Sequence, residues 1–419
     1  MHGSIEKMFI YFWILRLLGA LGHAKARKIV KGQRQAMATL REWREQVGQA
    51  RILWMHVASV GEFEQARPII ERLRHDVPAC KILLTFFSSS GYEMRKDYDK
   101  VDKVLYLPFA TMRNAKRWLR LLQPELAVFV KYEFWPAYLK ALKKNGVPTY
   151  LISAIFRPRQ LFFMPWGGFY RRLLHCFQHI YVQDQASAVL LQKFGVNHVT
   201  VAGDTRFDRV VEVCEVATEL PVIQGFVGEQ SNVLIAGSTW PEEEQMLARY
   251  VAERENVRLI LVPHELQPKH IQQIFQYFEG RYVCYSDAIP MSVSMARVLL
   301  VDKMGLLSSI YRYGQVAYIG GGFGAGSHNT LEAAVYGMPV VFGPKWQKFR
   351  EARGLQEVGA AISVNNYREL AAALDVAFEN KEIMGQKAND YVQRECGATD
   401  VIYNALFSTL KNNSTILDF

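Results

Sequence analysis

Short runs of apolar residues alternate with amphipathic stretches along most of the chain from residue 51 onward. In the first half these runs read as buried parallel strands at residues 52–57, 81–86, 104–106, 126–130, 149–152 and 179–182. Between them, residues 113–122 and 136–144 have the apolar spacing of helices. Because strands that alternate with helices form βαβ units, the pattern predicts an α/β fold with a parallel sheet.

The alternation lapses between about residues 208 and 230 and then begins again. Further strands are predicted at residues 233–236, 259–262, 298–301, 316–319 and 340–342. Doubly wound sheets bind ligands outside the carboxyl ends of their strands. We therefore expect two Rossmann-like doubly wound domains that face a central cleft. They occupy residues 45–210 and 231–395, with a linker at 211–230 and a C-terminal helix at 396–419 able to cross back to the first domain.

The N-terminus carries a different pattern. Residues 8–21 (MFIYFWILRLLGAL) are apolar except for Arg16, but the run is shorter than the roughly 20 residues of a spanning helix. A basic cluster follows at Lys25, Arg27, Lys28, Lys31 and Arg34. Such a cluster beside an apolar segment is attracted to anionic lipid head groups. We expect residues 1–35 to anchor the chain on an anionic membrane surface; the alternative is an ordinary helix docked on its own domain.

Composition narrows the class of protein. A chain of 419 residues usually forms two domains, and a charge of +10 favours anionic partners such as phosphorylated molecules or lipid head groups. No pattern of basic and aromatic residues typical of nucleic-acid binding is present, so nucleic acid is the weaker option. The five cysteines are scattered and form no CxxC pair, which argues against a disulfide framework or a zinc site.

The strand at residues 52–57 ends in Ala58-Ser59-Val60-Gly61-Glu62, which places a carboxylate at the ligand edge of the sheet. A helix N-terminus favours the ionised form of Glu62, and a carboxylate can accept a proton from an attacking hydroxyl. Ser59 and Gly61 are expected to contact substrate. The alternative is that Glu62 is a surface charge in a first helical turn.

Two further segments of the first half hold candidate residues. Glu133 lies between the strand at 126–130 and a helix that begins near Pro136, so it can share the ligand edge with Glu62. Its alternative is a helix-terminal charge above a packed Trp135. Arg206 could hold a phosphate or carboxylate, or pair with Asp204 or Asp208.

In the second half, strand ends again present polar groups. Residues 236–241 (AGSTWP) and 262–264 (VPH) bring candidate binding residues to the ligand edge: Ser238, Thr239, Pro263 and His264. A histidine at such a place can equally be satisfied within its own loop.

The glycine-rich segment at residues 319–332 is the densest signal in the chain. Its backbone amides can approach a phosphate, and its candidate binding residues are Gly321, Gly322, Phe323, Ser327, Asn329 and Glu332. Asn329 and Glu332 also have the spacing of a capping box, which is a purely structural explanation. Lys345 and Lys348 add positive charge after the next strand.

Gly320, Gly322 and Ala325 also match a dinucleotide-binding fingerprint, which raises a dehydrogenase as a rival. That fingerprint requires an acidic residue about 20 positions further on, at the end of the next strand. The strand at 340–342 ends in Gly343-Pro344-Lys345 instead. The second requirement is therefore absent.

Taken together, these segments resemble the 3-deoxy-D-manno-octulosonic acid (Kdo) transferase family. The resemblance is carried by WMHVASVGE at 54–62, EFWP at 133–136, AGSTWPEEE at 236–244, GSHNTLEAA at 326–334 and FGP at 342–344. It implies a GT-B fold and an inverting glycosyltransferase that moves Kdo from CMP-Kdo to a lipid A precursor, lipid IVA. It also implies no cofactor or metal, and a place at the cytoplasmic face of the cell inner membrane.

The resemblance also implies roles for single residues. It makes Glu62 the general base and Glu133 an assisting acid, while Lys131 stands where the family has a first acid in its ExExWP motif. Arg206 stands where the family has a lysine, with the charge kept and the shape changed. The rivals are a GT-B transferase that uses a UDP-sugar and a lipid-linked acceptor, and, from another class, a non-catalytic membrane adaptor.

Overall fold

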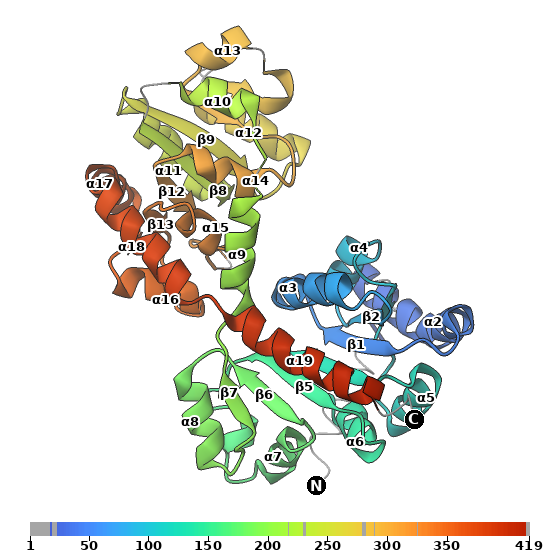
Figure 1. The fold of residues 1–419 in the computed structure, drawn as a ribbon. Coiled ribbons are helices and arrows are strands. Elements are labelled where there is room, and N and C mark those ends of the chain that lie inside the picture. The colour runs from blue at the N-terminus through green and yellow to red at the C-terminus, as the bar shows by residue number, and fades with distance from the viewer. Residues whose placement is uncertain are drawn as a thin grey trace. The chain divides into compact units, whose positions relative to one another are not determined.

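A computed structural model describes residues 17–18, 23–216, 218–228, 232–278, 282–288, 290–324 and 326–415. The chain forms two compact units, shown in Figure 1. The first unit comprises the described residues up to Arg209 together with those from Cys396 onward, and the second comprises those of Val210–Glu395.

The first unit is built on a seven-stranded parallel sheet with the order β3-β2-β1-β4-β5-β6-β7. Its strands are β1 (Ile52–Val57), β2 (Lys81–Phe86), β3 (Lys103–Tyr106), β4 (Leu126–Val130), β5 (Thr149–Ala154), β6 (His179–Val182) and β7 (Val199–Val201). β1 pairs with both β2 and β4, so the direction of strand addition reverses between β1 and β4. In a doubly wound sheet this topological switch point is where ligands bind.

Helices cover the sheet of the first unit. They are α2 (Ala24–Val47), α3 (Val60–Asp76), α4 (Ser89–Arg95), α5 (Met112–Leu122), α6 (Pro136–Lys144), α7 (Gly168–Leu174), α8 (Gln185–Lys193) and α19 (Ala398–Thr415). α19 lies beside α3, as Figure 1 shows, and the Tyr403 hydroxyl donates to Asp76 at 2.5 Å. The Tyr150 and Thr409 hydroxyls also meet at 2.7 Å. The last helix of the chain is thus part of the first unit.

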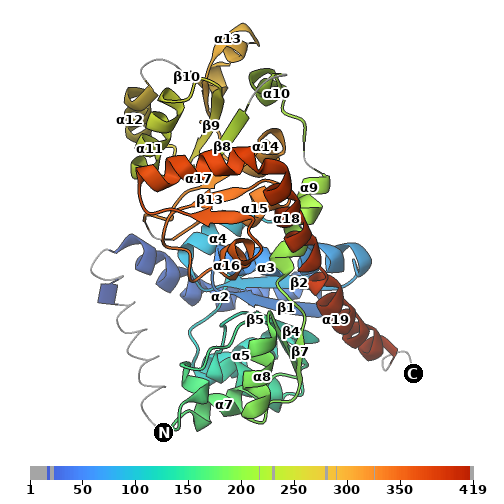
Figure 2. The same ribbon diagram turned by 90° about the vertical axis from the view of Figure 1, so that its left-hand side faces the viewer.

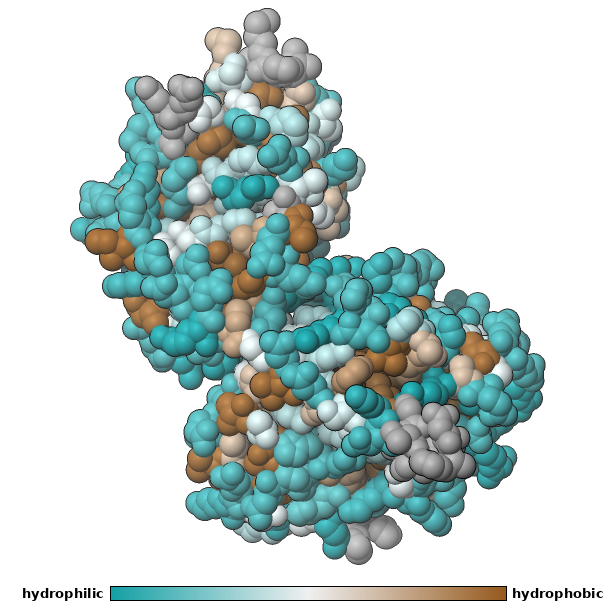
Figure 3. Space-filling model, viewed as in Figure 1, coloured by the Kyte–Doolittle hydropathy of each residue, from teal (hydrophilic) through white to brown (hydrophobic). Residues whose placement is uncertain are grey.

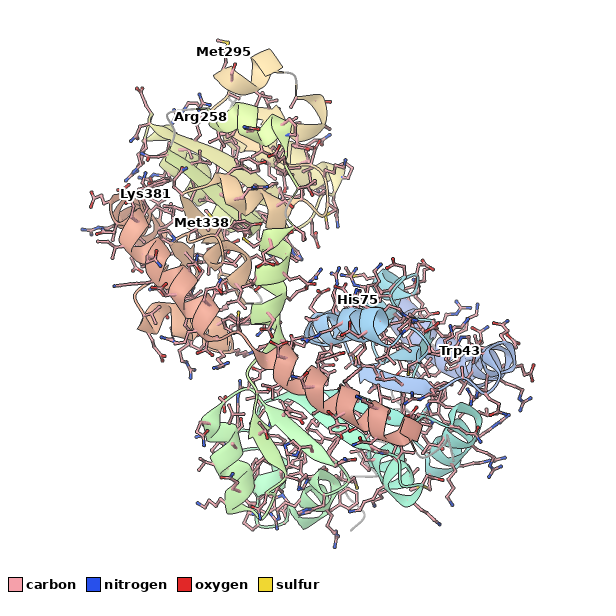
Figure 4. All side chains as sticks on the ribbon, in the orientation of Figure 1. Trp43, His75, Arg258, Met295, Met338 and Lys381 are labelled. Carbon is pink, nitrogen blue, oxygen red and sulfur yellow. The ribbon has the colours of Figure 1, made fainter. Side chains whose placement is uncertain are left out.

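The basic cluster near the N-terminus lies on α2. This helix packs on the first unit through Ala26, Ile29, Leu40 and Trp43, and Figure 4 labels Trp43. The division expected at residue 35 falls inside α2, because the amphipathic pattern continues to Val47. Of the apolar run at residues 8–21, all but Leu17 and Leu18 lie outside the described residues. No helix in the described part of the chain combines the length and hydrophobicity that a membrane span requires.

The second unit repeats the plan with a parallel sheet of order β10-β11-β9-β8-β12-β13-β14. Its strands are β8 (Asn232–Thr239), β9 (Val257–Pro263), β10 (Tyr282–Cys284), β11 (Val298–Leu300), β12 (Val316–Ile319), β13 (Val340–Phe342) and β14 (Ala361–Ser363). β8 pairs with both β9 and β12, which places the switch point of this sheet between β8 and β12. Both sheets are therefore parallel and Rossmann-like, with the order reversing at the first strand, and the second sheet differs in that β11 lies between β9 and β10.

The longer helices of the second unit are α11 (Pro241–Ala252), α12 (Pro268–Phe278), α16 (Arg350–Glu357), α17 (Tyr367–Glu379) and α18 (Lys381–Arg394). Figure 2 shows α17 over β13, which it contacts. The segment expected as a linker contains the end of α9 (Thr205–Glu215) and α10 (Pro221–Val227). α10 belongs to the second unit because Ile223 and Phe226 are fully buried there.

All eleven strands predicted from the apolar runs are present, and three others, β7, β10 and β14, were not predicted. Each of the three has only three residues, and β7, β10 and β14 are the outermost strands of their sheets. A short edge strand needs little apolar sequence because one side remains open.

The surface in Figure 3 is mostly hydrophilic, with hydrophobic residues in small groups.

Candidate functional site

The first group of candidate residues lies at the switch point of the first sheet. Glu62 is in the first turn of α3, which follows β1, and Glu133 follows β4, the strand that pairs with β1. Glu62 is 9% exposed and Glu133 is 7% exposed. The alternative of a surface charge is therefore wrong for Glu62, because its carboxyl group is almost entirely withdrawn from solvent.

The surroundings of Glu62 tune its proton affinity. Burial raises the pKa of its carboxyl group to about 7, and the negative charge of Glu133 acts in the same direction. The Ala58 backbone N–H, which donates to Glu62 Oε2 at 2.5 Å, and the Lys131 ammonium group oppose the rise. A carboxylate with a pKa near the working pH is suited to act as a general base.

Glu133 is held by two ring nitrogens. Trp135 Nε1 donates to Glu133 Oε2 at 2.6 Å, and His56 Nε2 lies 2.9 Å from the same oxygen. On its other side, His56 Nδ1 lies 3.1 Å from the Thr85 carbonyl oxygen. The Thr85 hydroxyl oxygen lies 2.9 Å from the same nitrogen, so Nδ1 has a partner whether it donates or accepts. Each ring nitrogen of His56 therefore has a polar partner, and the imidazole connects β2 to Glu133.

His56 is a residue that the sequence analysis missed. It is fully buried in the middle of β1, where its neighbours Trp54, Met55 and Val57 are also buried. A polar residue in such a run reads as a tolerated core residue. The available signal was a titratable side chain one strand away from a candidate acid, and its use requires knowing that β1 and β4 are neighbours.

The backbone around these acids has two unusual features. Lys131 has a φ of 62°, a left-handed conformation that costs a long side chain about 1 kcal/mol or more and is concentrated at functional sites. At Gly61, an added side-chain carbon would meet no described atom within 4 Å. Ser59 is the N-cap residue of α3, and its side chain makes no capping hydrogen bond. The surface beside Glu62 is therefore open toward solvent.

Arg206 pairs with Asp204, which was one of the alternatives considered from the sequence. Its Nε and Nη2 atoms donate to Asp204 Oδ2 at 3.0 and 2.8 Å. Asp204 is buried and also accepts from Gln65 Nε2 at 3.1 Å. The guanidinium group thus neutralises a buried carboxylate of its own chain, and a role in holding an anion stays a prediction.

The second group of candidate residues lies at the switch point of the second sheet. Ser238 and Thr239 end β8, Pro263 ends β9 and is followed by His264, and the glycine-rich segment follows β12. Ser238 has a φ of 55°, the same left-handed strain as Lys131 in the first unit. The Thr239 hydroxyl donates to Glu244 at 3.0 Å and is fully buried.

Close packing explains most of the glycines in the segment after β12. A side-chain carbon at Gly320 would lie 2.2 Å from the Ser238 carbonyl oxygen, and one at Gly322 would lie 2.5 Å from the Gly343 nitrogen. Gly321 has a φ of 87°. These glycines allow the ends of β8, β12 and β13 to approach one another.

Five backbone amides of the glycine-rich segment are already hydrogen-bonded within the chain. The N–H groups of Gly320, Gly321, Gly324, Gly326 and His328 all donate to acceptors within the chain. Lys345 Nζ donates to the carbonyl oxygens of Phe323 and Gly324, each at 2.8 Å. The segment is thus braced from within, and its contact with a phosphate stays a prediction.

The remaining candidates of this segment make local hydrogen bonds. Asn329 Nδ2 donates to Glu332 at 2.9 Å, and Asn329 Oδ1 accepts from the Leu331 N–H at 3.2 Å. This is a variant of the structural alternative, since the two side chains bond each other. Ser327 is buried, whereas Lys348 is exposed after β13.

A stack of three rings is the second feature that the sequence analysis missed. The ring centroids of Trp240 and His264 are 4.9 Å apart, and those of His264 and His328 are 4.4 Å apart. Burial and the neighbouring His264 lower the pKa of His328 to about 4, so its ring is neutral at pH 7. Its Nε2 accepts from Trp240 Nε1 at 3.3 Å. The three residues follow β8, β9 and β12, which only the strand order makes neighbours.

Glu243 braces the glycine-rich segment from α11. Its Oε2 accepts from the N–H of Gly321 at 3.1 Å and of Trp240 at 3.0 Å. Burial raises the pKa of Glu243 from 4.5 to about 7, against these hydrogen bonds. The folded state therefore binds this proton more tightly than the unfolded chain, and stability is lost as the pH rises from about 4.5 through 7.

We expect Glu243→Gln to raise stability above pH 7, because the amide resembles the protonated acid and keeps an oxygen for both N–H groups. The expected gain is on the order of 2 kcal/mol at pH 8, and it vanishes near pH 4.5. Thermal melting of both proteins at the two pH values checks this. A loss of stability at pH 8 that disappears at pH 4.5 would instead show that the ionised carboxylate stabilises the fold.

Comparisons with known proteins agree with this architecture. A profile of the family described as 3-deoxy-D-manno-octulosonic-acid transferase (kdotransferase) matches residues 33–209. A 3-deoxy-D-manno-octulosonic acid transferase of Aquifex aeolicus is 28% identical over 330 residues, which cover 77% of this chain and 84% of the relative. One from Bordetella pertussis is 26% identical over 384 residues, with 84% and 86% covered.

Among solved structures, the UDP-GlcNAc 2-epimerase of Neisseria meningitidis matches with a TM-score of 0.60 and 16% identity, covering 85% of this chain and all of that one. At this identity the match concerns the fold alone. Two parallel Rossmann-like sheets, each with functional candidates at its switch point, define a GT-B-like α/β protein. Within that class, residues 33–209 match the 3-deoxy-D-manno-octulosonic acid (Kdo) transferase family, and the transferases of Aquifex aeolicus and Bordetella pertussis are similar to this chain over most of its length.

Proposed function

We propose that this protein is a glycosyltransferase that transfers Kdo from CMP-Kdo to a hydroxyl group of a lipid A precursor such as lipid IVA. The observation that carries the proposal is the buried Glu62–Glu133 pair at the switch point of the first sheet, in a chain that is similar to Kdo transferases. The first unit is proposed to bind the acceptor and the second the donor. The N-terminal segment is proposed to hold the protein at the cytoplasmic face of the inner membrane.

The chemistry follows from the state of Glu62. As the acceptor oxygen attacks the anomeric carbon of Kdo, its proton passes to the Glu62 carboxylate. The bond between that carbon and the phosphate oxygen of CMP breaks, and CMP leaves with the electron pair. Attack from the face opposite the leaving group inverts the anomeric centre. Lys131, whose charge favours ionised Glu62, keeps the base active near neutral pH.

The donor site is proposed at the switch point of the second sheet. The ring stack of Trp240, His264 and His328 offers an aromatic face for a nucleobase, and Lys348 offers charge for a phosphate or carboxylate. Rigid packing of the glycine-rich segment would hold these groups in place. The backbone strain at Ser238 lies in the same region.

Donor choice tests this proposal against the rival that uses a UDP-sugar. We expect CMP, but not UDP, to raise the melting temperature of the protein, since a ligand that binds only the folded state stabilises it. With CMP-Kdo and lipid IVA, CMP release should accompany formation of a larger lipid. Stabilisation by UDP alone, or product formation only from UDP-sugars, would overturn the assignment.

Substitution of Gly61 separates folding from acceptor binding. Gly61 lies in α3 with open space around it, so Gly61→Ala should leave the melting temperature unchanged or raise it, because alanine favours helix by up to about 1 kcal/mol. An acceptor that approaches the backbone beside Glu62 would meet the added methyl group, and we expect its KM to rise roughly tenfold or more.

The matched control is Gly225→Ala in α10, where a side-chain carbon also meets no described atom within 4 Å. It should change neither KM nor kcat. An unchanged acceptor KM in Gly61→Ala would place the acceptor elsewhere.

A further inference from the structure

The stretch from residue 134 to residue 183 contains no aspartate or glutamate. It holds seven basic side chains, Lys140, Lys143, Lys144, Arg157, Arg159, Arg171 and Arg172. The stretch covers α6, β5, the loop after β5, and α7, so its charge is concentrated in one part of the first unit. α6 contacts α7, and Lys140 Nζ lies 4.6 Å from the centroid of the Phe169 ring. A surface with an excess of positive charge attracts anionic partners.

Two large apolar side chains are exposed in the same stretch. Residues 157–172, which we call the lipid loop, contain a short 3-10 helix, η1 (Leu161–Phe163), and the start of α7. Trp166 is 73% exposed and Leu161 is 49% exposed, whereas Phe162 and Phe163 between them are buried. Arg157, Arg159 and Arg172 are exposed on the same loop. Cationic and exposed aromatic groups therefore occur together.

Hydrogen bonds and packing within the lipid loop hold Trp166 and Leu161 in their exposed positions. Arg171 Nη1 donates to the carbonyl oxygens of Phe162 and Met164 at 3.0 and 3.1 Å. The Gly167 N–H donates to the Met164 carbonyl oxygen at 2.8 Å, and a side-chain carbon at Gly167 would lie 2.0 Å from the Leu161 carbonyl oxygen. Phe162 and Phe163 occupy the interior, so Leu161 and Trp166 have no place to fold inward.

We propose that the lipid loop lies on an anionic membrane surface, with Leu161 and Trp166 at the boundary between head groups and acyl chains. Tryptophan is enriched at this boundary because its ring is apolar and its N–H is polar. Basic side chains near an anionic membrane surface are attracted to its head groups. A free acidic protein is a poorer occupant, since the exposed tryptophan and leucine require an apolar partner as well as a charged one.

The lipid loop is packed directly against the candidate site. Phe134, which lies between Glu133 and Trp135 in the chain, has its ring centroid 4.6 Å from that of Phe162. Arg157 lowers the pKa of Tyr132, which burial otherwise raises. If the proposed function holds, a lipid-borne acceptor on this surface reaches Glu62 without leaving the membrane. This contact is separate from the N-terminal segment.

Tryptophan quenching in the full-length protein tests the proposal locally. Vesicles of phosphatidylglycerol with brominated acyl chains quench tryptophans that enter the boundary region, and the difference between wild type and Trp166→Phe reports Trp166 alone. We expect Trp166 emission to be quenched on these vesicles and unquenched on brominated phosphatidylcholine. Trp13 of the N-terminal segment is present in both proteins and cancels. Equal quenched fractions in wild type and variant would overturn the proposal.

A binding measurement gives a second, independent test. We expect Leu161→Ser/Trp166→Ser to weaken binding to phosphatidylglycerol vesicles roughly tenfold or more, because both apolar contacts are lost. The control is Met94→Ser/Val189→Ser, which removes apolar residues that are 60% and 54% exposed elsewhere on the first unit. Equal affinities of the two double variants would refute the lipid loop.

Turnover of a detergent-dispersed acceptor should be unchanged in the lipid-loop variant. This measurement tests catalysis separately from membrane binding. Kdo transfer that persists while vesicle binding is lost supports both the proposed function and the membrane contact. Failure of Kdo transfer in the wild type, with Trp166 still quenched, would refute the proposed function and leave the membrane contact standing.

Discussion

Glu62→Gln is expected to reduce kcat by roughly 10²–10⁴-fold at pH 8, the usual contribution of a positioned general base. Glutamine has nearly the same shape and can still accept from the Ala58 N–H, so the melting temperature should fall little. The acceptor KM should also change little, because glutamine cannot take a proton but fills the same space. Initial rates and thermal melting of both proteins check this, and full turnover in the variant would remove Glu62 from the mechanism.

The pH dependence of the wild type gives the same residue a second signature. The base must be ionised, and the pKa of Glu62 is about 7, so kcat/KM should rise with pH up to about 7 and level off above it. An ordinary exposed glutamate would give a plateau from about pH 5. A flat profile between pH 5.5 and 8 would contradict the account of Glu62 as a buried base.

His56→Gln is expected to move the acid limb of this profile upward by about one pH unit. An imidazole can carry positive charge beside Glu133, whereas glutamine can donate a hydrogen bond to Glu133 but is never charged. Removing a group that can balance the charge of Glu133 strengthens the repulsion between Glu133 and Glu62, so we expect the pKa of Glu62 to rise further. The rate at pH 7 should fall about fivefold and recover near pH 9, which a purely structural defect would not do.

The control for His56 is Trp135→Phe. It removes another hydrogen bond to Glu133 Oε2 without changing the charge of the site. Its acid limb should move much less than that of His56→Gln. Identical shifts in the two variants would mean that hydrogen bonding, rather than charge balance, sets the pKa of Glu62. Lys131 and Tyr132 near Glu62, and Thr85 beside His56, are unchanged in both variants.

The main strands and the placement of the two acids could be predicted from the sequence. Buried parallel strands are continuous apolar runs, and Glu62 and Glu133 each follow such a run. Any residue directly after a parallel strand lies at the ligand edge, so this inference needs no knowledge of strand order. The inference from the strand ends places both acids at the ligand edge of the sheet. Only the observed pairing of β1 with β4 places them together at the switch point.

The contacts of individual side chains could not be predicted from the sequence. His56 reads as a core residue because it sits inside an apolar strand, and its partner is 77 positions away. Lys345 reads as an anion-binding charge, yet it caps carbonyl oxygens of the glycine-rich segment. The glycines there read as a phosphate cradle, although Gly320 and Gly322 are required by the backbone of neighbouring strands. Each of these depends on which strands lie side by side.

The central claim is that this protein attaches Kdo to a lipid acceptor. Mass spectrometry of lipid IVA after incubation with the protein and CMP-Kdo tests it most directly. We predict an acceptor heavier by one or more whole Kdo residues with the wild type, and unmodified acceptor with Glu62→Gln in the same time. An acceptor left unmodified by the wild type while CMP-Kdo is intact, or modified equally by Glu62→Gln, would contradict the account.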